Sequence, residues 1–136
     1  MAGGTASAAP APPPTAVVVA GDEETRVLLR GLLRLHNCRV LGEAGGAAQA
    51  LDLLARHHPA LLIADVNLSE GSYSHLLQEA KRLDSHLRII LVAPSHRSPT
   101  PAAEGARSDA VLYRPFRIRE FAEALATVGP SSPPVA

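Results

Sequence analysis

Ionisable side chains follow three separate apolar runs of this sequence, at the point where each run ends. Asp22 and Glu23 come directly after TAVVVAG, Asp65 closes the run ALLIAD, and Arg114 follows DAVLY. Two carboxylates held close together repel one another and favour a cation between them. Mg²⁺ suits such a place, because one or two carboxylates, water and phosphate oxygens hold it. A nearby guanidinium complements a phosphoryl group, so these residues indicate phosphoryl chemistry on a carboxylate.

Strands and helices must bring these side chains together. Short apolar runs of the sequence alternate with segments whose apolar residues have helical spacing. The first run, TAVVVA, is continuous and rich in β-branched residues, as a strand buried on both faces should be. Alternation of strands with helices predicts an α/β fold, with a parallel sheet and helices on both faces. Ligands of such sheets bind beyond the carboxyl ends of the strands, which is where the ionisable residues fall. Strands are predicted at 15–20, 38–43, 60–64, 88–93 and 109–113.

Helical spacing of apolar residues indicates the elements between the strands. The first helix, about 23–36, is predicted to face inward with Val27, Leu28, Leu32 and Leu35. Where alternation calls for a fourth helix, residues 94–108 hold three prolines and no leucine, isoleucine or valine. That segment is therefore predicted to be mostly loop, with the fourth helix short or missing. The remaining inward faces are Ala47, Ala50, Leu51 and Leu54; Tyr73, Leu76, Leu77 and Ala80; and Ile118, Phe121, Ala122 and Leu125.

The length and the two ends of the chain define one domain. A chain of 136 residues suits a single domain, and 46% of its residues are hydrophobic, enough for a core. Residues 1–14 and 129–136 are rich in alanine, glycine, proline and serine, and cannot offset the entropy of ordering. We therefore expect disordered tails at both ends and a folded domain over 15–128.

Charge and cysteine content argue against several functions. Thirteen basic and thirteen acidic residues cancel, which gives no reason to expect direct binding to nucleic acid or to a membrane. The apolar runs are all much shorter than the roughly 20 residues of a membrane helix. A single cysteine, Cys38, excludes an intramolecular disulfide and fits a reducing, cytoplasmic location. P-loop and dinucleotide-binding motifs are absent.

The sequence also resembles a known protein family. Through RVLGEAGGAAQALDLLARHHPALLIADV, the chain is similar to the receiver domains of bacterial two-component response regulators, and most of all to the subgroup with C-terminal helix-turn-helix domains. The resemblance covers about residues 16–128. It implies a flavodoxin-like, doubly wound sheet of five parallel strands in the order 2-1-3-4-5.

The resemblance also assigns roles to individual residues. Asp65 matches the phosphoacceptor, which receives a phosphoryl group from a histidine kinase. Asp22, Asp65 and the backbone carbonyl of Asn67 match the Mg²⁺ ligands, and Glu23 is a further candidate ligand. The motif RPF at 114–116 matches the lysine-proline-phenylalanine motif of the family, so Arg114 replaces the lysine that contacts the phosphoryl group. The bond before the proline of that motif is usually cis.

Several positions depart from the family pattern. Gly21 stands where the first acid of the metal-binding pair belongs, and Ala93 stands where a switch hydroxyl belongs. Val111 replaces the aromatic switch residue, and Ser69 replaces the usual proline. Mg²⁺ binding is therefore expected to be weakened. A phosphoryl group would also lose a hydrogen-bond donor worth about 1–3 kcal/mol, which impairs the conformational response.

Two functions remain open on the sequence alone, and neither is enzymatic. The chain is either a stand-alone receiver phosphorylated at Asp65 with Mg²⁺, or a pseudo-receiver that binds another protein without phosphorylation. In a purely structural interpretation, Asp22 only caps a helix and Arg114 neutralises the acids without a metal. Because only about eight residues follow the last helix, the output is expected to pass through a partner protein in trans or through a homodimer.

Overall fold

The computed structural model describes residues 13–94 and 108–128. The disordered tails predicted at 1–14 and 129–136 fall outside this part of the chain, apart from residues 13 and 14. The loop predicted at 94–108, with its short or missing fourth helix, also falls outside it, apart from its two end residues.

The described residues form five strands and four helices, which alternate along the chain except that β5 follows β4. All neighbouring strands run parallel, in the order β2-β1-β3-β4-β5, which confirms the predicted flavodoxin-like topology. None of the described helices is long and apolar enough to cross a membrane. The strands are β1 (Thr15–Val19), β2 (Arg39–Ala44), β3 (Leu61–Asp65), β4 (Arg88–Ala93) and β5 (Ala110–Tyr113). The helices are α2 (Glu23–Leu35), α3 (Ala47–His57), α4 (Tyr73–Leu83) and α5 (Ile118–Val128).

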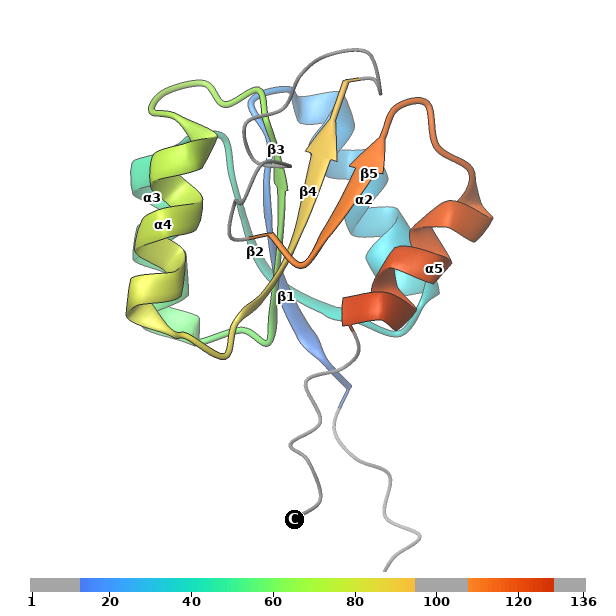
Figure 1. Cartoon of the computed structure of the whole chain (residues 1–136), viewed down its shortest axis with the longest axis horizontal. Coiled ribbons are helices and arrows are strands. Elements are labelled where there is room, and N and C mark those ends of the chain that lie inside the picture. The colour runs from blue at the N-terminus through green and yellow to red at the C-terminus, as the bar shows by residue number, and fades with distance from the viewer. Residues whose placement is uncertain (1–12, 95–107, 129–136) are drawn as a thin grey trace, which may run out of the picture.

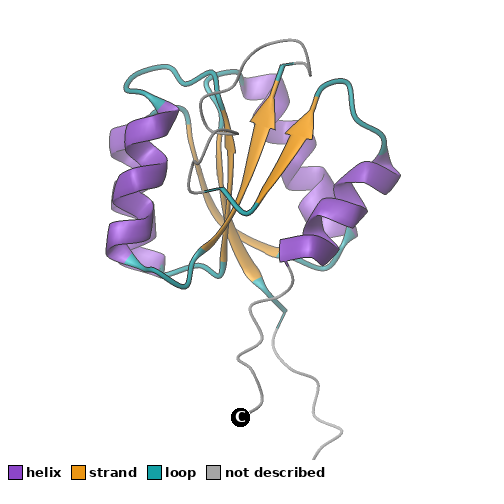
Figure 2. Ribbon diagram, viewed as in Figure 1, coloured by secondary structure: helices purple, strands orange, loops and turns teal. Residues whose placement is uncertain are grey.

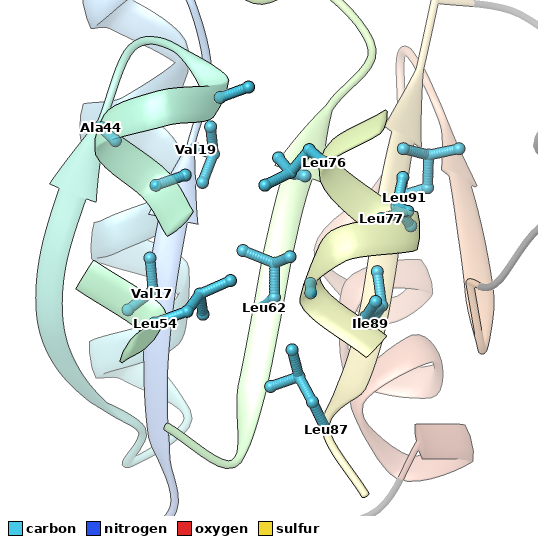
Figure 3. Close-up of a cluster of buried hydrophobic side chains, with 14 residues drawn as sticks. Val17, Val19, Ala44, Leu54, Leu62, Leu76, Leu77, Leu87, Ile89 and Leu91 are labelled. Carbon is cyan, nitrogen blue, oxygen red and sulfur yellow. The ribbon is translucent and has the colours of Figure 1, made fainter. Parts of the chain in front are cut away.

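Helices cover both faces of the sheet, with α3 and α4 on one face and α2 and α5 on the other (Figure 1, Figure 2). Because side chains alternate along a strand, each strand supplies both cores. Val17 and Leu62 point toward α3 and α4 (Figure 3), whereas Val18 and Ile63 pack with α2 and α5. β1 and β3 are therefore almost wholly buried, as their continuous apolar sequences predicted.

The inward face of α2 differs from the prediction. Val27, Leu28 and Leu35 are exposed, and of the predicted set only Leu32 is buried. The helix has leucines on more than one side, so two overlapping i, i+4 patterns exist and the sequence does not choose between them. Packing against the sheet selects the pattern that buries Thr25, Leu29, Leu32 and Leu33.

The phase of α5 was also predicted only in part. Phe121 is fully buried as expected, but Ile118 is 59% exposed. The other buried residues of this helix are Ala124 and Val128. Leu125 is partly buried and packs against the same core, as predicted, and Ala122 is also only partly buried. In α3 and α4, by contrast, six of the predicted residues are buried: Ala47, Ala50, Leu54, Leu76, Leu77 and Ala80. The other two, Leu51 and Tyr73, are partly buried and pack against the same core.

Lys81, the only lysine in the sequence, ties the end of α4 to the sheet. Its ammonium donates to the backbone carbonyl of Leu87 and lies 3.5 Å from the carboxylate of Asp109. Asp109 in turn accepts a hydrogen bond from the backbone N–H of Ile89, at 2.7 Å. This lysine therefore has a structural role at the start of β5.

Candidate functional site

The predicted site lies at the edge of the sheet where β1, β3, β4 and β5 end (Figure 1). Asp65 is the last residue of β3, between β1 and β4, and is only 1% exposed. A carboxylate this deeply buried must be hydrogen-bonded or paired with a cation, because burial without a partner is costly. Its partners therefore decide what the site can do.

Arg114 is the cationic partner of Asp65. Its Nη2 donates to Asp65 Oδ2 as an ion pair, and Asp65 Oδ1 accepts a hydrogen bond from the backbone N–H of Asn67, at 3.0 Å. The backbone N–H of Arg114 donates to the carbonyl of Ala93, at 2.9 Å, which holds the arginine beside the end of β4. As the resemblance implied, the Arg114–Pro115 peptide bond is cis.

The guanidinium of Arg114 is not fully hydrogen-bonded. Its Nε is buried and has no hydrogen-bond partner within the described parts of the chain. The side chain thus places one N–H group on the carboxylate and leaves another without an acceptor. The pair is held mainly by its opposite charges, with the carboxylate shielded from water and the guanidinium partly exposed.

Asp22 is the N-cap of α2 rather than a free carboxylate. Its Oδ2 accepts hydrogen bonds from the backbone N–H and the hydroxyl of Thr25, both at 3.0 Å. Glu23 is exposed in the first turn of the same helix, where an acid favours the helix dipole. The structure therefore gives Asp22 the capping role that was one of its two interpretations.

The carbonyl of Asn67 is turned toward the end of β1. It accepts a hydrogen bond from the backbone N–H of Gly21, at 2.9 Å. Asn67 belongs to the β3–α4 loop, residues 66–72, which also contacts the end of β2 through a hydrogen bond from the N–H of Ser69 to the carbonyl of Gly45, at 2.8 Å. The structure thus brings Asp65, Arg114 and Asn67 together, with Gly21 beside them.

Sequence reasoning missed three residues near this edge. Thr25 completes the cap with Asp22, and its place three residues after an aspartate was a usable signal. Arg26 donates from Nη1 to the carbonyl of Ala20, at 2.7 Å. Glu70 accepts from the backbone N–H of Ala48, at 2.9 Å, from 22 residues away, and no local pattern predicts such a contact.

The two switch positions lack the groups that the family uses there. Ala93 is fully buried at the end of β4 and has only a methyl group where a hydroxyl is expected. Val111, on β5, is partly buried and packs against the core below α3 and α4. Neither side chain can donate a hydrogen bond to a phosphoryl group on Asp65.

A comparison with known families supports the resemblance. A model of the response regulator receiver domain matches residues 16–126. The chain belongs to the response regulator receiver domain family. This receiver domain is 28% identical to the chemotaxis protein CheY of Bacillus subtilis over 101 residues, 74% of this chain and 84% of that protein. Its place in two-component signal transduction follows from the family.

Other relatives agree with this placement. The receiver domain is 30% identical to the transcriptional regulatory protein PdtaR of Mycobacterium tuberculosis over 108 residues, 79% of this chain but only 53% of PdtaR. A response regulator receiver domain protein from Clostridium thermocellum has the same fold, with a TM-score of 0.75 at 18% identity over 85% of this chain and 93% of that one. The likeness to the helix-turn-helix subgroup and the stand-alone character stay predictions.

Receiver domains generally bind Mg²⁺ at the phosphorylation site, so the predicted ligands can be tested for their fit. Asp22 caps a helix, the Asn67 carbonyl accepts from Gly21, and both oxygens of Asp65 accept from protein donors. Arg114 already neutralises Asp65 and would repel a divalent cation. The described residues also contain no cluster of three or more metal-binding side chains. In this arrangement the residues do not fit a bound Mg²⁺ ion.

Proposed function

We propose that this receiver domain acts as a pseudo-receiver, a module of signal transduction that binds a partner protein in one conformation without phosphorylation of Asp65. The observation that carries this proposal is the ion pair between Asp65 and Arg114 at the end of β3. Asp65 Oδ2 must leave the guanidinium before it can attack a phosphoryl donor. The carboxylate is therefore better placed to hold β3 and β5 together than to act as a nucleophile.

The missing switch groups support the same function. A phosphoryl group moves a receiver between two states only through contacts that differ between those states. Moving such an equilibrium from 1:99 to 99:1 takes about 5.5 kcal/mol of differential binding. Ala93 supplies none of it through hydrogen bonding, and Arg114 is already committed to the unmodified carboxylate.

The partners follow from the family. Receiver domains work with histidine kinases and with output partners, so the proposed partner here is a signalling protein that acts in trans. The fold presents helices on both faces of the sheet, which offers surfaces for a protein partner. We place the function in binding rather than in enzymatic turnover, because Asp65, the buried acid of the site, is held in an ion pair with the guanidinium of Arg114.

Phosphorylation of Asp65 by a histidine kinase is the alternative function. Its position at the carboxyl end of β3 favours this alternative, since ligands of doubly wound sheets bind at that edge. Arg114 beside it could also contact a phosphoryl group, because a guanidinium suits phosphate geometry. This alternative needs the ion pair to open and the cation to find ligands that are now engaged.

An amide NMR titration with Mg²⁺ and beryllofluoride, a mimic of the phosphoryl group, separates the two functions. We expect no saturable shifts around Asp65, Arg114 or residues 109–125. Asp65→Asn is the matched control, because it keeps the size of the side chain and removes its charge. Saturable shifts in the wild type that the Asp65→Asn variant lacks would establish Asp65 as a working phosphoacceptor and overturn the proposal.

A further inference from the structure

The end of β1 and the β3–α4 loop approach each other more closely than a side chain at position 21 would allow. A Cβ atom built on Gly21 would lie 2.9 Å from the backbone nitrogen of Ser69 and 3.0 Å from the carbonyl carbon of Leu68. It would also lie 3.1 Å from the carbonyl oxygen of Asn67. These neighbours are all backbone atoms, so the contact cannot be relieved by the movement of a flexible side chain. The loop therefore occupies the space that the first acid of the pair would need.

Hydrogen bonds hold the loop in this position from two strands. Just beyond β1, the N–H of Gly21 donates to the carbonyl of Asn67. Beyond β2, the carbonyl of Gly45 accepts from the N–H of Ser69. Glu70 then accepts twice from the start of α3, through its carbonyl from the N–H of Ala47 at 3.1 Å and through its carboxylate from the N–H of Ala48. The loop is thus a connected part of the structure.

Charge at the site is also balanced without a metal. A divalent cation in a receiver neutralises acids from different strands, and here a guanidinium neutralises one of them, Asp65. The carbonyl of Asn67, which the resemblance assigns to the cation, instead satisfies the N–H of Gly21. The chain itself therefore neutralises Asp65 and satisfies the backbone N–H of Gly21 at this edge of the sheet.

We propose that the β3–α4 loop closes on Gly21 in place of a bound divalent cation, and that Gly21 is the residue that permits this closure. This inference rests on the proposed function and deepens it, because it states what keeps the site closed in the absence of phosphorylation. The absence of a side chain at position 21 then has two effects. It removes one acidic ligand, and it gives the space of that ligand to the loop that carries the Asn67 carbonyl.

Two glycines allow a matched test of this proposal. A Cβ atom at Gly21 meets three backbone atoms, whereas a Cβ atom at Gly31, on α2, meets nothing within 4 Å. We expect Gly21→Ala to lower the thermal unfolding midpoint, because the loop must move. Gly31→Ala should leave the midpoint unchanged or raise it, since alanine favours a helix over glycine.

Hydrogen exchange then shows whether the loss lies in the loop. In Gly21→Ala, the backbone amides of residues 21 and 69 should exchange faster with solvent than in the wild type, while those of β4 keep their rates. If Gly21→Ala matches the wild type in both its midpoint and these exchange rates, the loop does not depend on Gly21 and the proposal is wrong.

A cation titration of the wild type completes the test. Mn²⁺ prefers the same oxygen ligands as Mg²⁺, and as a paramagnetic ion it broadens nearby amide signals. We expect no selective broadening at residues 65–70, and selective, saturable broadening there would overturn the proposal. A response to beryllofluoride would overturn the proposed function, whereas unchanged behaviour of Gly21→Ala would overturn only the closure of the loop.

Discussion

Arg114 donates a hydrogen bond from Nη2 to Oδ2 of Asp65, which lies 49 residues earlier in the chain. The carboxylate is 1% exposed, whereas the side chain of Arg114 is 35% exposed. The acid thus lies inside the protein and its counter-ion lies at the boundary with solvent. This asymmetry means that loss of the arginine leaves a buried charge, whereas loss of the acid leaves a cation that water can still reach.

Arg114→Ala is therefore expected to destabilise the domain. An unpaired buried acceptor costs about 1–3 kcal/mol, and more when it is charged. Chemical denaturation would measure the change in the free energy of unfolding. Arg117→Ala, an exposed arginine in the same loop, is the control and should change it by about 0.5 kcal/mol or less. Equal stability of the two variants would contradict the structural importance of the ion pair.

The role of Asp22 can be tested with its neighbour Glu23. Asp22→Ala should cost about 0.5–2 kcal/mol through loss of the helix cap. Glu23→Ala should cost less, because it loses only a favourable interaction with the helix dipole. The cost at Asp22 should be the same with Mg²⁺ as with a chelator, measured by thermal unfolding. A cost that appears only with Mg²⁺ would make Asp22 a metal ligand instead.

Adjacent leucines test the observed orientation of α2. Leu29 is fully buried and Leu28 is 50% exposed. Leu29→Ala should cost about 2–5 kcal/mol, as buried leucines do. Leu28→Ala should cost about 1 kcal/mol, because only part of its surface leaves water on folding. The reverse order in urea denaturation would mean that the inward face predicted from the sequence is the real one.

The sequence was a good guide to the sheet and a poorer guide to two helices. The strands were predictable because short, continuous β-branched runs between turn residues are typical of strands buried on both faces. The residues at their carboxyl ends followed from topology, which is why Asp65 and Arg114 were expected to meet. The phase of α2 was not predictable, because its leucines cover more than one side and the sheet makes the choice.

The contacts of the β3–α4 loop could not be predicted from the sequence for a different reason. The sequence indicates a missing acid at Gly21, but atoms from residues 67–69 fill the space that this acid would occupy. No local sequence pattern predicts the contact of Glu70, since its partner at Ala48 is distant in sequence. A missing side chain shows that a ligand is lost, but the rest of the fold decides what replaces it.

Cys38 provides a test that depends on pH. Burial raises the pKa of its thiol above the ordinary value, so the folded state favours the protonated form. The domain should therefore keep its full stability below the ordinary thiol pKa of about 8.5 and lose some as the pH rises through it toward the raised value. The unfolding free energy of Cys38→Ala should lack this contribution, and a pH dependence identical to that of the wild type would contradict it.

Reactivity of the same cysteine gives an independent measurement. The thiolate is the form that reacts, and Cys38 is only 6% exposed. Alkylation by iodoacetamide at about pH 8.5, near the ordinary thiol pKa, should be slow in the folded protein and fast in denaturant. Rapid alkylation of the folded protein would show that the start of β2 opens readily.

The strand order has a consequence for synthesis of the chain. β1 lies between β2 and β3, so these three strands can pair before β4 and β5 have been made. Asp65 ends β3 and must wait for Arg114, which follows β5, before its charge is neutralised. A nascent domain therefore lacks the counter-ion of its central acid until residue 114 has been made.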